Sequence, residues 1–320
     1  MHRAELLILA YHDIFPTGFP EQNPLFGMTV ESKEFDWQLD YLHEKYNPIT
    51  FQQFVEWFNH GASIPRHAVL ITIDDGHKNN LQHVLPLLKK RNTPAVCFVL
   101  AQNLGATKLL WFEEAYYRIM FSSKKSLTMR RDDHWSLEDA GQRSKTCGKL
   151  FSLFRTLSED EQQEQLAHLR RQLPLEEGEL QFRGRFEFLS SEDLRVLRQN
   201  NVEIAAHSLS HPILASLRAE TVKREIVESK QRLEELQGVP VRAFAYPFGT
   251  WGLDFGVREM ELVQQCGFYF GFTGESGFVG RDSDRFALPR ISIGRMCHAH
   301  FASTVAGALS SLKTMVSVSS

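Results

Sequence analysis

The chain has 320 residues, of which 42% are hydrophobic and 23% are charged, and its formal net charge is -3. This composition is typical of a globular protein with a large core, and it provides no basic surface, so we expect no nucleic-acid partner. No apolar run reaches the ~20 residues of a membrane-spanning helix, so we expect no transmembrane segment. The apolar segment 6–10 is too short for a signal peptide, which favours a cytoplasmic protein.

Short apolar segments alternate with amphipathic ones along most of the chain. Strands are expected at 5–12, 68–75, 94–101, 201–208, 241–249 and 267–273. Helices are expected at 34–46, 51–59, 79–91, 191–200, 219–237 and 256–266. This alternation predicts right-handed βαβ units and a mostly parallel sheet, either open or closed into a barrel.

The segment 219–237 has the clearest helical period. Its apolar face is expected to contain Val222, Ile226, Leu233 and Leu236. Gly238 follows directly and supplies a stop signal for the helix.

The segment from about 105 to 185 interrupts the alternation. Its pattern indicates helices with a charged middle, and we interpret it as a mainly helical insertion within one catalytic domain that spans residues 1–320. It follows the strand at 94–101, so we expect it at the carboxyl end of the sheet, either as a solvated decoration or as one wall of a substrate groove. Trp111 and Phe112 are interpreted as helix core.

Polar residues stand where several expected strands end. They are His12, Asp74, Asp75, His207, His211 and the turn at 246–249. Active sites of parallel α/β folds form at the carboxyl ends of strands, because the loops converge there. Carboxylates and imidazoles that meet at this edge would form a metal site.

His207 and His211 are four residues apart, a spacing that binds zinc when it lies on a helix. Here no Glu follows His207, and Pro212 disfavours a helical backbone at His211. We therefore expect both imidazoles where a strand ends and a loop begins, turned toward a common point. Two histidines with one carboxylate are a common ligand set for a catalytic divalent metal.

The pair Asp74 and Asp75 supplies a carboxylate for that set and leaves a second one. Neighbouring residues of an extended chain point in opposite directions, so a turn is needed to bring both side chains to one site, and Gly76 permits it. One aspartate then completes the metal site. The other can accept a proton from the attacking water as general base.

Three motifs together resemble the polysaccharide deacetylase family, whose shared domain is the NodB-homology domain. They are "ITIDDGHKNN", "HSLSHPIL" and "AFAYPFG", and the resemblance covers roughly residues 6–100 and 186–295. It implies a distorted (β/α)7 barrel that removes N-acetyl groups from a sugar or polysaccharide. It also implies one divalent metal ion, with Zn²⁺ preferred and Co²⁺, Mn²⁺ or Ni²⁺ as alternatives for this ligand set.

The resemblance assigns roles around the metal. It makes Asp74 the catalytic base, and it makes Asp75, His207 and His211 the metal ligands. Arg290 resembles an arginine that pairs with the base aspartate in family members without an arginine shortly before the proline-aromatic motif.

The resemblance also assigns residues around the substrate. Tyr246 matches the position whose backbone N–H helps to bind the oxyanion, and Pro247 and Phe248 are expected beside it in the substrate site. The general acid is not identified, because the late leucine-x-histidine motif of the family has no counterpart here. His12, which we expect near the site, is one candidate, and His298 and His300 are the others.

Two alternatives remain beside deacetylation of an N-acetylated glycan. One is hydrolysis of a non-sugar C–N bond on the same framework. The other is a catalytically silent glycan-binding module, whose signature would be the loss of Asp74 or of a metal ligand. The remaining histidines, His77 among them, are interpreted as surface or packing residues.

Overall fold

The structure is a computed structural model that describes residues 6–18, 27–129, 133–175 and 186–306. Its strands are β1 Leu6–Tyr11, β2 Asp13–Phe15, β3 Thr29–Glu31, β4 Asn47–Pro48, β5 Ala68–Ile73, β6 Ala95–Val99, β7 Ser126–Thr128, β8 His134–Ser136, β9 Val202–Ala206, β10 Ala243–Ala245, β11 Phe270–Phe272, β12 Phe278–Val279 and β13 Ile291–Ser292. Its helices are α1 Ser32–Lys45, α2 Phe51–His60, α3 Leu85–Arg91, α4 Trp111–Phe121, α5 Ala140–Phe154, α6 Glu159–Gln172, α7 Ser191–Arg198, α8 Ala219–Gln237 and α9 Val257–Gln265. In the described part of the chain, no helix is both long and apolar enough to cross a bilayer.

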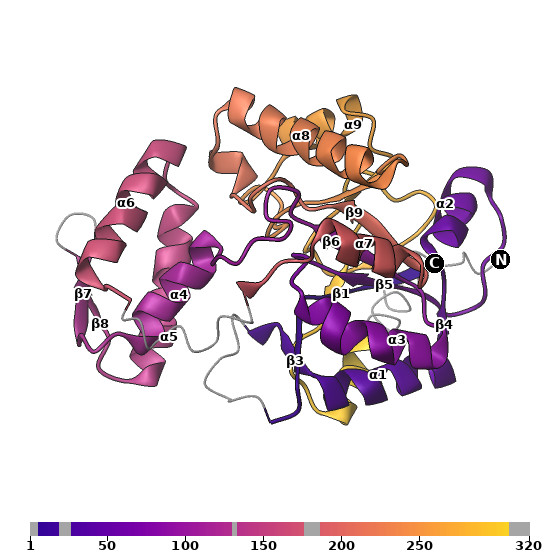
Figure 1. The fold of residues 1–320 in the computed structure, drawn as a ribbon, viewed down its shortest axis with the longest axis horizontal. Coiled ribbons are helices and arrows are strands. Elements are labelled where there is room, and N and C mark those ends of the chain that lie inside the picture. The colour runs from indigo at the N-terminus through magenta and orange to yellow at the C-terminus, as the bar shows by residue number, and fades with distance from the viewer. Residues whose placement is uncertain (1–5, 19–26, 130–132, 176–185, 307–320) are drawn as a thin grey trace, which may run out of the picture.

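The central sheet is parallel and runs in the order β11, β10, β9, β6, β5, β1 (Figure 1). The segment that leads into β13 links its two edges. On one side the Thr273 N–H donates to the Leu288 carbonyl, and on the other side β13 pairs in parallel with β1. The sheet therefore curls into a (β/α) barrel, distorted by the short strands β4 and β12 at its margin. The expected distorted (β/α)7 barrel is confirmed.

Alternation along the strands separates two apolar cores. Leu9 and Ile71 pack under the surrounding helices, whereas Ile8 and Leu70 point into the barrel. The interior is filled by apolar side chains, and α2 adds Phe54 to the same cluster. Because side chains of a strand alternate between its two faces, Asp74, four residues after Leu70, also points into the barrel.

The strands and helices expected from the sequence are present, with differences at their ends. In the helix expected at 79–91, residues Asn80–Val84 form a π-helix that precedes α3. The buried face of α8 contains Val222, Ile226 and Leu233, as expected, and Gly238 ends the helix in a left-handed conformation. Leu236 is 52% exposed, so its assignment to the buried face was wrong. Glu225 lies on the buried face instead, where its carboxylate accepts hydrogen bonds from residues 209 and 210.

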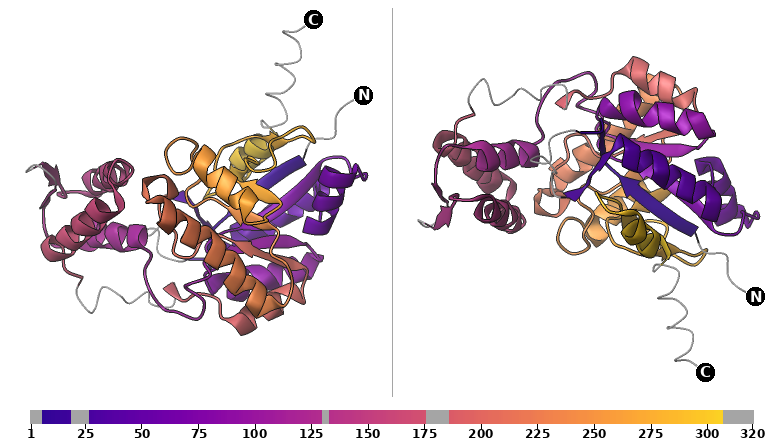
Figure 2. Two further views of the ribbon diagram at one scale, coloured as in Figure 1. Left: turned by 90° about the horizontal axis from the view of Figure 1, so that it is seen from above. Right: turned by 90° about the horizontal axis from the view of Figure 1, so that it is seen from below.

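The elements α4, α5, α6 and the β7–β8 hairpin form a lobe beside the barrel, visible in both views of Figure 2. This inserted lobe has its own apolar cluster, which includes Leu150, Phe154 and Leu169. Its two connections to the barrel run side by side, because the Phe188 N–H donates to the Ala106 carbonyl. The last expected residues of the insertion, 176–185, lie outside the described residues.

Candidate active site

Asp74 continues the inward face of β5 and points into the barrel. Arg290 forms a bidentate pair with its carboxylate, with Nη1 2.8 Å from Oδ1 and Nη2 2.8 Å from Oδ2. The same guanidinium donates to the Thr273 carbonyl and to the Thr72 hydroxyl, which fixes its plane. Burial alone would raise the pKa of Asp74, but the charge of Arg290 outweighs it and holds the pKa well below its ordinary value.

Asp75 turns back toward the same site because its backbone leaves the extended conformation. Its φ is 71°, in the left-handed region, and Gly76 follows with φ 75°. A side chain at Gly76 would collide with Val99, since an added Cβ would lie 2.9 Å from its Cγ1. The expected turn therefore involves both residues, and glycine is required at the second for space as well as for conformation.

The two histidines lie where β9 ends and its loop begins. His207 follows Ala206, and its Nδ1 lies 2.8 Å from the Ala245 carbonyl, which assigns the proton to Nδ1 and leaves the Nε2 lone pair free to bind a metal. His211 has a φ of 64°, so the segment is not helical, as the following proline indicated. Ser208 supports this loop by accepting the His211 N–H through its hydroxyl.

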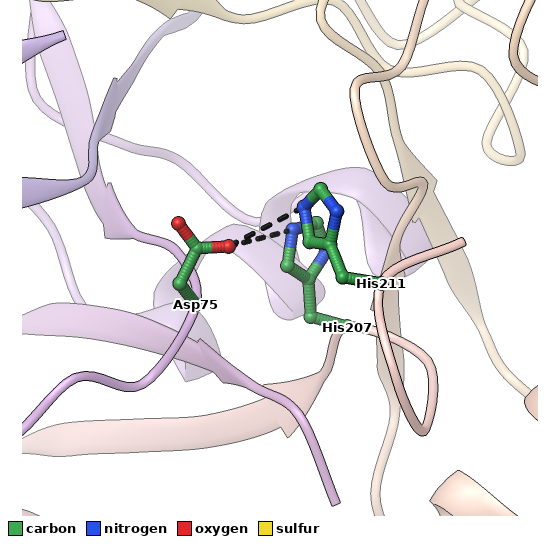
Figure 3. Close-up of side chains that lie close together, drawn as sticks. All are labelled: Asp75, His207 and His211. Atoms are coloured by element: carbon green, nitrogen blue, oxygen red, sulfur yellow. Dashed lines mark ion pairs between the residues drawn. The ribbon is translucent and has the colours of Figure 1, made fainter. Parts of the chain in front are cut away.

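Asp75, His207 and His211 meet at one point (Figure 3). The Oδ1 atom of Asp75 lies 3.5 Å from Nε2 of His207 and 3.4 Å from Nε2 of His211. All three side chains are buried, and among the described residues neither Asp75 Oδ1 nor His207 Nε2 has a hydrogen-bond partner. Unsatisfied buried atoms converging in this way fit a divalent cation, and the N₂O donor set suits Zn²⁺.

The protonation states of the two histidines suit metal binding. Burial lowers the pKa of His207 to about 4 and lowers the pKa of His211 well below its ordinary value, so both imidazoles are neutral near pH 7. Burial also raises the pKa of Asp75, because an ionised carboxylate loses its hydration there. A divalent cation would reverse that effect.

Glu225 of α8 holds the loop between the two histidines. Its carboxylate accepts the N–H groups of Leu209 and Ser210 at 2.9 and 3.0 Å and the Ser210 hydroxyl at 2.8 Å. Glu225 was not among the site residues predicted from the sequence. Its signal was a carboxylate on the largely apolar face of α8, where an acidic residue is costly unless it is hydrogen-bonded.

Tyr246 does not fit the expected oxyanion role. Its backbone N–H donates to the Phe272 carbonyl at 3.0 Å, as part of the β10–β11 pairing, and its hydroxyl donates to the Phe286 carbonyl. The residue is buried and stacked on Phe255. The expected oxyanion role is therefore wrong, because the backbone N–H that it requires is already hydrogen-bonded within the sheet. Pro247 is also buried and leaves little surface for a substrate.

Phe248 lies at the edge of the site and joins it to the inserted lobe. Its ring is 4.5 Å from that of His211 and 5.3 Å from that of Phe112. Phe112 also contacts His211 directly at 4.9 Å, and Trp111 Nε1 donates to the His211 carbonyl. Trp111 and Phe112 are thus more than helix core, since α4 presents both to a metal-ligand candidate.

The three candidates for the general acid lie in different places. His12 follows β1, and its Nε2 is 3.7 Å from Oδ2 of Asp74, with 20% of its side chain exposed. His298 is exposed and stacks on Trp37 of α1, outside the barrel, and His300 is exposed as well. Only His12 is brought to the site.

His77 is buried beside the site, so its interpretation as an ordinary surface or packing residue misses its charged surroundings. Its Nδ1 lies 3.1 Å from Asp13 Oδ1, and its Nε2 lies 3.6 Å from Glu113 Oε1. Burial would lower the pKa of His77, but the two carboxylates outweigh it and raise the pKa to about 9. Asp13, His77 and Glu113 also form a second group with the spacing of metal ligands.

Solved structures with the same fold are deacetylases. The chain superimposes on the Streptococcus pyogenes deacetylase PplD in complex with acetate with a TM-score of 0.63, at 16% identity, covering 95% of this chain and 99% of that one. It superimposes on IcaB from Ammonifex degensii with a TM-score of 0.61, at 19% identity, covering 95% and 97%. At these identities the similarity shows the fold.

Sequence comparisons identify the family. The chain is 20% identical over 291 residues to the putative polysaccharide deacetylase YxkH of Bacillus subtilis, covering 91% of this chain and 72% of that protein. It is 22% identical over 268 residues to the poly-beta-1,6-N-acetyl-D-glucosamine N-deacetylase of Staphylococcus epidermidis, covering 83% and 68%. The polysaccharide deacetylase family model matches residues 62–270, which include Asp74, Asp75, His207 and His211. The chain therefore belongs to the polysaccharide deacetylase family.

Proposed function

We propose that Asp74, Asp75, His207 and His211 form the active centre of a metal-dependent N-deacetylase whose substrate is an N-acetylated glycan. The observation that carries this proposal is the different environment of two adjacent carboxylates. Asp74 is paired with Arg290, whereas Asp75 faces two neutral imidazoles. One carboxylate is thus suited to proton transfer and the other to metal binding.

Asp75, His207 and His211 would hold one divalent ion, with Zn²⁺ favoured by the donor set. Such an ion supplies Lewis-acid polarisation of the acetyl carbonyl and lowers the pKa of the attacking water. The hydrogen bond from His207 Nδ1 to the Ala245 carbonyl keeps Nε2 directed toward Asp75, and Glu225 keeps the loop of His211 in place.

Asp74 is the proposed general base. It accepts a proton from the water as the oxygen adds to the acetyl carbon, and Arg290 holds the carboxylate in one orientation and ionised. The C–N bond then breaks, the amine nitrogen receives a proton, and acetate leaves. Asp74 holds the proton taken from water, so it can return that proton to the nitrogen.

Phe248 and Phe112 line the approach to this centre from the side of the inserted lobe. We propose that the lobe forms one wall of the substrate site. Aromatic rings there suit the apolar face of a sugar and the methyl of an acetyl group. The naming of the Staphylococcus epidermidis relative as a poly-beta-1,6-N-acetyl-D-glucosamine N-deacetylase supports a polymeric N-acetylglucosamine substrate.

The test is acetate release from a panel of substrates by Zn²⁺-reconstituted protein. The panel contains β-1,6- and β-1,4-linked N-acetylglucosamine oligomers and small N-acetyl amides of non-sugars. Turnover of at least one glycan above the small amides is expected. Preference for a small amide would support the non-sugar alternative, and absence of turnover with metal bound would support the silent module. Elemental analysis should find about one metal ion per chain, and less in His211→Ala.

A further inference from the structure

The loop that follows Asp75 is hydrogen-bonded to the base of the inserted lobe. The Lys78 N–H donates to the Glu187 carbonyl, and the Leu189 N–H donates to the Gly76 carbonyl. The ring of Phe188 packs on the ring of His77 at 4.6 Å. The metal-ligand loop and the lobe connection are therefore one continuous piece of structure.

His77 adds a side-chain link to the lobe itself. Asp13, the first residue of β2, faces its Nδ1, and Glu113, in the first turn of α4, faces its Nε2. Asn79 donates a further hydrogen bond to Asp13 at 3.1 Å. His77 is 2% exposed and Glu113 is 1% exposed, so the link is shielded from solvent and from salt. We call Asp13, His77 and Glu113 the His77 bridge.

A bridging ring fits this group better than a metal ion does. The two carboxylates face different nitrogens of one ring, and a single imidazole cannot present both nitrogens to one ion. Asp13 Oδ1 already accepts from Asn79, and Glu113 Oε2 accepts the Leu110 N–H at the start of α4. The ring therefore links the two carboxylates through different nitrogens, with Nδ1 3.1 Å from Asp13 Oδ1 and Nε2 3.6 Å from Glu113 Oε1.

The position of α4 matters because the same helical turn contacts His211. Trp111 Nε1 donates to the His211 carbonyl at 3.2 Å, and the Phe112 ring lies against the His211 ring. We infer that the His77 bridge is a positioning device that fixes α4 to the barrel and thereby fixes His211 for metal binding. This inference rests on the proposed function in so far as His211 is taken to be a metal ligand.

The decisive variant is Glu113→Gln, which keeps an oxygen for the Leu110 N–H and removes the charge that faces His77. Its matched control is Glu114→Gln on the same helix, because Glu114 pairs with Arg118 and Arg170 inside the lobe. Amide hydrogen exchange of the metal-free proteins is measured at 110–116 and 207–211. Glu113→Gln should speed exchange in both segments, whereas Glu114→Gln should leave 207–211 unchanged.

Zn²⁺ affinity, measured by competition with a chelating dye, gives the second readout. Glu113→Gln should weaken Zn²⁺ binding by about 10- to 100-fold, the range found when residues that orient metal ligands are changed. Glu114→Gln should leave the affinity unchanged. Equal affinity and unchanged exchange at 207–211 in Glu113→Gln would overturn the inference, as would equal effects of both variants. Two Zn²⁺ ions per wild-type chain, with one lost in Glu113→Gln, would replace the bridge by a metal site.

Failure of the metal assignment would look different. If the wild-type protein binds no Zn²⁺, the proposed function fails, while the exchange data on metal-free protein still decide the bridge. If Glu113→Gln does not fold, Asp13→Asn removes the charge on the other side of the ring and should speed exchange at 207–211 in the same way.

Discussion

Arg290 and Asp74 form a bidentate pair in which both hydrogen bonds are 2.8 Å long and both side chains are almost fully buried. The pair fixes the charge and the orientation of one carboxylate. Within the described part of the chain, the adjacent carboxylate of Asp75 has no arginine partner and faces two imidazoles. Two neighbouring residues of one type thus acquire different chemistry from their surroundings.

Exchanging each carboxylate for an amide should separate the two roles. Asp74→Asn should lower kcat by about 10²- to 10⁴-fold and retain metal, because it removes a base and no ligand. Asp75→Asn should lose metal and activity together. Metal content and kcat measured on the same preparations check this, and the reverse pattern would exchange the two assignments.

Removing Arg290 should destabilise the fold as well as the reaction. Arg290→Met leaves the buried Asp74 carboxylate without its cation, which typically costs about 3–5 kcal/mol. The double variant Arg290→Met with Asp74→Asn should recover part of that loss, because no unpaired charge remains. Urea unfolding at pH 7 measures both. Equal stability of the single and double variants would show that the charge of Asp74 is not what Arg290 balances.

Gly76 should tolerate no side chain. Its φ of 75° and the 2.9 Å approach of an added Cβ to Val99 predict that Gly76→Ala costs about 1–3 kcal/mol and displaces the metal-ligand loop. Adding Val99→Ala removes the collision and leaves the conformational strain, so it should restore only part of the stability and of the metal affinity. Full stability in Gly76→Ala alone would contradict the geometry.

Much of the barrel and the centre could be predicted because both depend on local patterns. Apolar runs ending in polar residues predicted the strands, and the carboxyl ends of parallel strands meet at one edge. The placement of Asp74 follows from alternation along β5. The non-helical backbone at His211 followed from the proline after it, although its left-handed φ did not.

The contacts between distant segments could not be predicted in this way. Trp111, Phe112 and Glu113 lie in a helix with an ordinary amphipathic pattern, and only the docking of the lobe brings them to His211 and His77. The wrong prediction of an oxyanion role for Tyr246 has a similar origin. Whether its N–H is free depends on the pairing of β10 with β11, which no local pattern near Tyr246 reveals.

The metal-free protein should lose stability between about pH 6.5 and pH 4. His207 has its pKa lowered to about 4 by burial, against an ordinary value of 6.5. Between pH 6.5 and pH 4, His207 is therefore protonated in the unfolded chain and neutral in the folded chain. The stabilisation is complete above pH 6.5, and it declines by up to about 1.4 kcal/mol per pH unit below it.

Urea unfolding at pH 7.5, 6 and 5 measures this slope. His207→Gln removes the titrating group and should flatten the slope by one proton. His211 contributes in the same direction, and Asp75, whose pKa burial raises, contributes in the opposite direction. Identical slopes in the wild type and His207→Gln would mean that His207 is not held neutral by burial.

The last prediction concerns the proton that reaches the leaving amine. His298 and His300 lie outside the site, so His298→Ala and His300→Ala should leave kcat/KM within about 2-fold. His12 is near Asp74, but burial lowers its pKa and Asp74 only partly offsets this, so its ring is neutral at pH 7 and is a poor proton donor. Asp74 gains a proton when water is activated, and its low pKa makes that proton easy to release. His12→Gln should therefore lower kcat/KM by less than about 10-fold. A loss of 10² or more with metal retained, together with loss of a limb of the pH profile, would instead make His12 the general acid and reduce Asp74 to the base alone.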